Sequence, residues 1–121
     1  PPAPVGKPLP AGGGEPGKVF MRNLAASQKG DIDGMIATAS SAQAEEMRKS
    51  KDDPDFPQMI ELMKAFVPKS AKVLGGRDFG DRAELDVEGT DADGGPTTGL
   101  IRMVKEADGW KVEKSSFKSK G

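Results

Sequence analysis

The sequence lacks three residue types on which protein chemistry often depends. Among its 121 residues there is no cysteine, no histidine and no tyrosine. Without cysteine, the chain cannot form disulfides, use a thiolate nucleophile or hold a metal through sulfur. Without histidine, it lacks the commonest general base near neutral pH and the commonest metal ligand. Catalysis would have to use carboxylate, amine, guanidinium or hydroxyl groups, and we expect no cofactor and no metal site.

The sequence also lacks a large excess of either charge, and it has no long apolar run. The formal net charge is −1, which gives no general attraction to nucleic acid. The basic end of the chain, formed by Lys111, Lys114, Lys118 and Lys120, has no interleaved aromatic residues, so we expect no nucleic-acid partner. No apolar run approaches the ~20 residues of a membrane-spanning helix, so we expect no transmembrane segment.

The first 17 residues differ in composition from the rest. They hold six prolines and five glycines, and their only large apolar side chains are Val5 and Leu9. Such a segment buries too little surface to offset its ordering entropy, which predicts a flexible tether over residues 1–17. We then expect one domain over residues 18–117 and a loose end over 118–121. A Pro/Gly-rich leader without an initial methionine is typical of an exported chain, periplasmic or membrane-tethered in a bacterium, after removal of a signal or addition of a lipid anchor.

The first half of the domain has apolar residues at helical spacing. Asp31 is placed to cap one helix and Gly30 to end another. The strongest apolar stripe contains Met59, Met63 and Phe66, and Pro68 ends it. The predicted helices cover residues 16–29, 32–39, 42–49 and 57–67.

After Pro68 the pattern changes to the alternation of strands. It is clearest where Ala83, Leu85 and Val87 alternate with charged residues, so one face of the sheet is buried and the other is wet. Gly75 and Gly76 predict a bulge, and Asp108–Gly109 predicts a hairpin turn. The predicted strands cover residues 71–79, 82–88, 97–106 and 110–117. Helices followed by an antiparallel meander predict an α+β fold, with the N-terminal helices packed on a four-stranded sheet.

Three stretches of this pattern resemble the nuclear-transport-factor-2-like, or cystatin-like, family of α+β cones. The first is Phe20 to Ile36, where one predicted helix ends and the next begins at Lys29-Gly30-Asp31. The second is the charged strand Ala83 to Gly89, and the third is the hairpin Ile101 to Val112, with tryptophan after its turn. The likeness covers roughly residues 17–117 and is greatest to small exported bacterial members without an assigned activity. It implies a curved sheet that cradles the helices.

The resemblance leaves several functions open. The fold hosts isomerase-like and dehydratase-like enzymes, which would here need a carboxylate inside the cone; Asp33, Asp78 and Asp86 are the candidates. It also hosts non-enzymatic binding domains, which the missing residue types favour. A structural accessory domain of an envelope assembly is a third hypothesis.

A binding domain of this shape predicts an apolar pocket inside the cone. Its candidate residues are Phe20, Met59, Met63, Phe66, Met103 and Trp110, and its ligand would be an apolar small molecule. Core packing is the simpler role for most of the six methionines. Apolar residues on both faces of the strand at 97–106 indicate a central strand or one covered by a partner. We therefore also expect a protein partner or a homodimer through the sheet.

Two short motifs are similar to ligand sites. Residues 12–18 nearly match a phosphate-binding loop, but Val19 stands where Ser or Thr should follow, and no strand is expected before it. Asp31 and Asp91 begin Asp-x-Asp-Gly runs that lack the later ligands of a calcium loop. A helix cap at Asp31 and a turn at Asp91 are the simpler interpretations, with weak cation binding at Asp91 and Asp93 left open.

Overall fold

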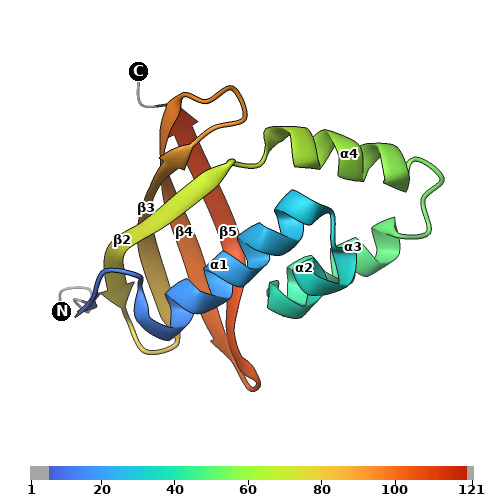
Figure 1. Ribbon diagram of the computed structural model, residues 1–121. Helices are drawn as coiled ribbons and strands as arrows, with labels where there is room; N and C mark the ends of the chain where they lie inside the picture. The colour runs from blue at the N-terminus through green and yellow to red at the C-terminus, as the bar shows by residue number, and fades with distance from the viewer. Residues whose placement is uncertain (1–5, 120–121) are drawn as a thin grey trace.

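In the computed structural model, which describes residues 6–119, four helices precede most of an antiparallel sheet (Figure 1). The helices are α1 (Gly14–Lys29), α2 (Ile32–Thr38), α3 (Ser41–Ser50) and α4 (Phe56–Phe66). The strands are β1 (Lys7–Leu9), β2 (Ser70–Asp78), β3 (Arg82–Thr90), β4 (Pro96–Glu106) and β5 (Gly109–Ser119). The predicted α+β fold with a curved antiparallel sheet is therefore confirmed.

The sheet is a meander in the order β1-β2-β3-β4-β5, and every pair is antiparallel. Its helix face carries Ala83, Leu85 and Val87, all buried, whereas Glu84 and Asp86 point to the outer face. The predicted bulge lies between Val73 and Gly75. β4 lies inside the sheet between β3 and β5, which is one of the two arrangements predicted for it.

The fifth strand corrects our prediction for the leader. Lys7–Leu9, expected within a tether, pairs with Gly76–Asp78 of β2, and α1 begins at Gly14. Leu9 packs against the core, and the backbone N–H of Gly12 donates to Val73 O at 2.9 Å. One apolar side chain and a few backbone bonds suffice here because β2 supplies a ready sheet edge. The tether prediction is wrong for residues 7–17; its residues 1–5 lie outside the described part of the chain.

The end of the chain also differs from the prediction. β5 continues to Ser119, so Lys118 and Ser119 belong to the sheet and not to a loose end. Thr97 Oγ1 donates to Lys118 O at 2.6 Å, which ties this last part of β5 to β4. Residues 120 and 121 lie outside the described chain.

The core lies between α1 and the helix face of β2 to β5. Its fully buried side chains are Phe20, Leu85, Val87, Ile101 and Met103. α1 crosses this face diagonally (Figure 1). The middle of the predicted cone is thus filled by the protein's own side chains.

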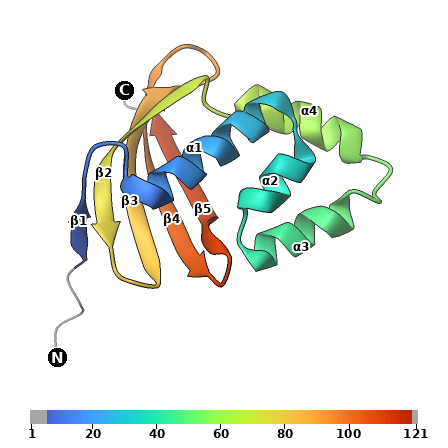
Figure 2. The same ribbon diagram turned by 60° about the horizontal axis from the view of Figure 1, so that its bottom comes forward.

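The remaining helices lie beyond the β5 side of the sheet, as both views show (Figures 1 and 2). Helix α4 has no buried residue, and Met59, Leu62 and Phe66 are 46%, 61% and 74% exposed. Core packing was predicted for most methionines, and for Met59 this is wrong.

Candidate functional site

An apolar hollow separates α4 from β5 and forms the candidate site. Its volume is ≈ 300 Å³. We call it the α4 hollow, and its lining residues come from α1, from the end of α4 and the link that follows it, and from β5: Phe20, Asn23, Leu24, Ser27, Met63, Phe66, Val67, Pro68, Ser115 and Phe117. None of these lining residues is charged, so the hollow suits an apolar group.

The β5 wall depends on a glycine in the neighbouring strand. Phe117 lies opposite Gly99 of β4, and a Cβ at Gly99 would be 2.6 Å from the Phe117 ring. The absence of that Cβ lets the ring lie against the sheet, where Phe117 packs on the core cluster. Phe117 thereby forms an apolar wall and leaves the space toward α4 open.

Two of the three polar side chains that line the hollow, those of Asn23 and Ser27, take part in hydrogen bonds. Asn23 Nδ2 donates to Thr38 Oγ1 at 3.0 Å, and Ser27 Oγ donates to Asn23 O at 2.9 Å. Gln28 Nε2 donates to the carbonyl oxygens of Pro68 and Lys69, both at 2.9 Å, and so fixes the chain where α4 leads into β2. Within residues 6–119, no buried side-chain N or O atom lacks a partner. Apolar contact would therefore dominate ligand binding in the hollow, and Ser115 adds one exposed hydroxyl in the β5 wall.

A second apolar groove lies on the other side of α4. Its volume is ≈ 220 Å³, and we call it the methionine groove: Ile32, Met35, Gln43, Glu46, Met47, Ser50, Phe56, Met59, Ile60 and Met63. Met63 lines both this groove and the α4 hollow. Helix α4 is thus bordered by open apolar space on two sides, with one flexible side chain between them.

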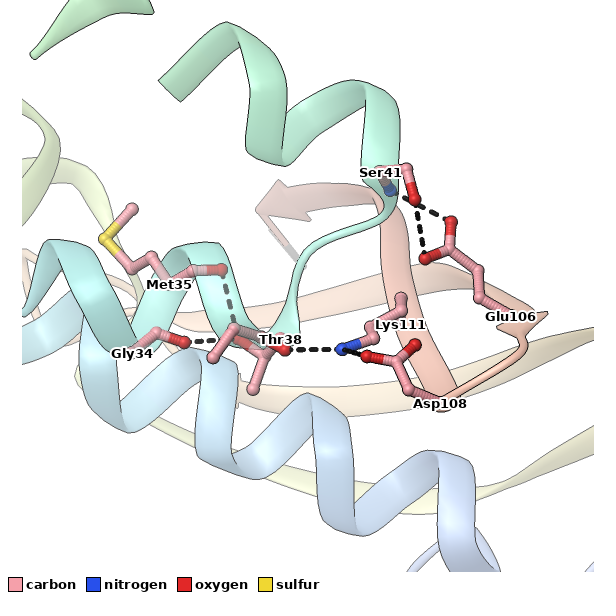
Figure 3. A network of polar contacts seen from close by, with 8 residues as sticks. Gly34, Met35, Thr38, Ser41, Glu106, Asp108 and Lys111 are labelled. Carbon is pink, nitrogen blue, oxygen red and sulfur yellow. Dashed lines mark hydrogen bonds and ion pairs between the residues drawn. The ribbon is translucent and has the colours of Figure 1, made fainter. Parts of the chain in front are cut away.

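Polar contacts to the β4–β5 hairpin hold α2 and α3 in place (Figure 3). Lys111 Nζ donates to Ala37 O at the end of α2 at 2.7 Å and lies 3.1 Å from Asp108 Oδ2. Glu106 accepts from both Ser41 N and Ser41 Oγ at the start of α3, each at 2.9 Å. The link between the two helices also joins the sheet edge, because Ala39 forms an isolated β-bridge with Val112 of β5.

The structure does not gather the six predicted pocket residues around one cavity. Phe20 and Met103 are core residues, 2% and 1% exposed, although the edge of Phe20 reaches the α4 hollow. Met59 lines the methionine groove, Phe66 the α4 hollow and Met63 both. Trp110 packs against the core beside the hairpin turn, with Lys105 Nζ 5.8 Å from its ring centre.

Sequence reasoning missed Phe117 and Ser115, which form the β5 wall. It also assigned most methionines to the core, yet only Met35 and Met103 are buried, and Met21 and Met59 are 39% and 46% exposed. The apolar stripe of α4 was the available signal, because it marks an apolar face on this helix.

The carboxylates proposed for an enzyme lie elsewhere. Asp86 accepts two hydrogen bonds from Arg77 on the outer face, at 3.0 and 3.3 Å, and Arg77 Nε also donates to Glu84 at 3.2 Å. These hydrogen bonds raise the pKa of Arg77 above its ordinary value, and the bonds to Asp86 have the larger effect. Asp33 is an exposed residue of α2 that lies 3.5 Å from Lys51 Nζ, and Asp78 accepts from Gly80 N in the β2–β3 turn.

The short motifs have structural roles. Asp31 Oδ1 accepts from Gly34 N as the predicted helix cap, and Asp91 Oδ1 accepts from Asp93 N and Gly95 N in its turn. A strand does precede residues 12–18, contrary to our expectation, but it is the short antiparallel edge strand β1, and Lys18 is an exposed residue paired with Glu15. Residues 6–119 contain no group of three or more acidic side chains that could hold a metal.

Other depressions fit a ligand less well. The largest two, ≈ 450 and ≈ 480 Å³, lie on the sheet and are lined partly by charged residues such as Lys72, Glu88 and Arg102. Among the described helices, none is both long enough and apolar enough to cross a membrane.

Solved structures with a similar fold include two bacterial proteins. One is the solution structure of a SEC-C motif containing protein from Rhodopseudomonas palustris, 17% identical, with a TM-score of 0.60 over 84% of this chain and 77% of that chain. The other is the crystal structure of an NTF2-like protein of unknown function from Shewanella baltica OS155, 15% identical, with a TM-score of 0.56 over 88% of this chain and 92% of that chain. No family model and no curated protein matches the sequence. The likeness supports the NTF2-like fold and concerns the fold alone.

Proposed function

We propose that this domain is a non-enzymatic binding module that takes an apolar group of its ligand in the α4 hollow. One observation carries the proposal: α4 presents apolar side chains toward open space on both sides and has no buried residue. Exposed apolar surface costs free energy in water, so a surface of this kind on a folded domain is typical of binding sites.

The lining of the hollow favours binding over catalysis. Of the ten residues that line it, none is an acid or a base. The groups with shifted pKa values, Arg77 and Asp108, lie on the outer face and in the β4–β5 turn. Acid–base catalysis needs a titratable group within reach of the substrate, and the hollow does not supply one from its own walls.

A neutral fluorescent probe, N-phenyl-1-naphthylamine, tests this proposal. We expect its fluorescence to rise on binding, and Met63→Gln to weaken binding by at least about fivefold because a polar amide replaces the apolar side chain between the two apolar spaces. Met21→Gln is the matched control, since Met21 is 39% exposed on α1 and lines neither space. Equal binding by the wild type and both variants would contradict the α4 hollow as the site.

A further inference from the structure

The edge of the sheet next to the α4 hollow is open along half of β5. The link between α2 and α3 covers its beginning, where Ser40 N donates to Val112 O at 2.9 Å and Gln43 Nε2 reaches Glu113 O at 3.4 Å. From Lys114 to Ser119, no described strand pairs with β5 on that side. An open edge offers backbone N–H and C=O groups to another extended chain.

The side chains of this open edge have two different surroundings. Ser115 and Phe117 lie on the helix face and line the α4 hollow. Lys114 and Lys118 lie opposite Arg102 and Thr98, on the outer face, and both lysines are exposed. A strand added beside β5 would place alternate side chains in the hollow and the others next to these lysines.

The charges on the outer face favour an acidic neighbour. Across the sheet, one row reads Arg77, Glu84, Arg102, Lys114, so the signs alternate until β5. There, Lys114 stands directly opposite Arg102, and like charges in this position are destabilising. A carboxylate on the far side of Lys114 would give this lysine a neighbour of opposite charge.

A second copy of this chain fits the edge poorly. If two β5 strands paired antiparallel about Ser116, Lys114 of each copy would face Lys118 of the other on the same surface. Lysines on an exposed edge are a common protection against such self-pairing. An acidic strand would be attracted by the same two charges.

We propose that β5 binds an extended segment of a protein partner as a sixth strand, with acidic side chains opposite Lys114 and Lys118 and apolar side chains in the α4 hollow. Backbone bonds would give this strand affinity, and the alternation of acidic and apolar residues would give it specificity. The inference rests on the proposed function, because it assigns the occupant of the same hollow.

Synthetic peptides with blocked ends test the inference. We compare Thr-Glu-Val-Thr-Val-Glu-Thr with its counterpart in which Lys replaces Glu, and with the scrambled Glu-Glu-Val-Val-Thr-Thr-Thr. Fluorescence anisotropy of labelled peptides measures binding up to about 1 mM, the range expected of a short strand. We expect only the alternating acidic peptide to bind and to slow hydrogen exchange of amides between Lys114 and Ser119.

A charge reversal makes the test specific. In the variant Lys114→Glu with Lys118→Glu, we expect acidic-peptide binding to weaken by at least about tenfold and the lysine peptide to bind instead. The variant should fold, since Glu at position 114 would face Arg102, and circular dichroism checks this. Lys18→Glu with Lys49→Glu is the control, because these lysines are 71% and 68% exposed on α1 and α3.

Several outcomes would overturn the inference. They are equal binding of all three peptides, no effect of the charge reversal, binding without protection of β5, or pairing of β5 with a second copy. If no peptide binds but the neutral probe still binds and Met63→Gln still weakens it, the strand is wrong and the proposed function stands. If neither a peptide nor the neutral probe binds, the sixth strand and the proposed function are both wrong.

Discussion

Lys111 connects the helical half of the molecule to the sheet through one amine. Its side chain is only 14% exposed, and its Nζ contacts both Ala37 O and Asp108. We expect Lys111→Met to lower the free energy of unfolding by about 1.5–3 kcal/mol, the usual range for a hydrogen bond that involves a charged group. Urea denaturation measures this loss. Asp108→Asn is the control: it keeps the bond to Ala37, so its effect should be clearly smaller.

The same substitution should change how Asp108 titrates. The hydrogen bond from Lys111 is the main cause that lowers the pKa of Asp108 below its ordinary value of 3.8. A lowered pKa in the folded state stabilises the protein above pH 3.8, and this contribution is lost as the pH falls through the folded-state value. In Lys111→Met, NMR titration of the carboxyl carbon should show the Asp108 pKa rising toward 3.8. An unchanged value would show that the ion pair is not formed in solution.

Residue-scale prediction from the sequence fails at one place for a physical reason. The Asp108–Gly109 turn was predicted, and it sets Glu106 opposite Gly109. Continued without interruption, that register would place Glu113 opposite Arg102. The structure has a bulge there, so Lys114 takes that place and Phe117 faces Gly99. No glycine or proline marks the bulge, and a one-residue shift moves every later side chain to the other face.

At the scale of elements, α4 is the least supported helix. It has no buried residue, whereas α1 contributes Val19, Phe20 and Leu24 to the core. Local opening needs little free energy where few apolar groups are buried. We expect α4 amides to exchange faster than α1 amides in native-state hydrogen exchange. Equal protection of the two helices would mean that α4 opens only when the whole domain unfolds.

Single substitutions should show the same contrast in stability. Phe66 is 74% exposed, so Phe66→Ser should change the unfolding free energy by no more than about 0.5 kcal/mol. Phe20 is 2% exposed, so Phe20→Ala should cost about 3–5 kcal/mol. Thermal or urea denaturation of both variants measures the difference. A large loss in Phe66→Ser would show that the Phe66 side chain is covered in solution.

Most of the elements were predictable, because all except β1 have a local signal. Asp31, Gly30 and Pro68 mark helix ends, and the alternation from Ala83 to Val87 marks β3. The hollow was not predictable, since it depends on how far α4 stands from β5. Periodicity identifies an apolar face but does not say whether another element covers it.

At the scale of the whole molecule, a three-residue leader strand forms one edge of the sheet, and β5 forms the other. β1 was missed because Pro- and Gly-rich composition predicts little burial, whereas pairing with an existing edge needs only backbone groups. Export to the periplasm or a membrane tether stays a prediction, as does the homodimer through the sheet.

The outer face gives the dimer prediction a direct test. Leu100 and Val104 are half-buried there among charged neighbours, and Arg102 lies between them and opposite Glu84. If this face pairs with that of a second copy, Arg102→Glu would place a second carboxylate beside Glu84 in the contact. We expect this to weaken the affinity of the dimer by at least about tenfold. Sedimentation velocity across a concentration series measures this, with Arg22→Glu on α1 as the matched control for the same charge change. A monomer at every concentration, or a dimer insensitive to Arg102→Glu, would remove the outer face as a dimer contact and would leave the sheet edges as the places where another chain could pair.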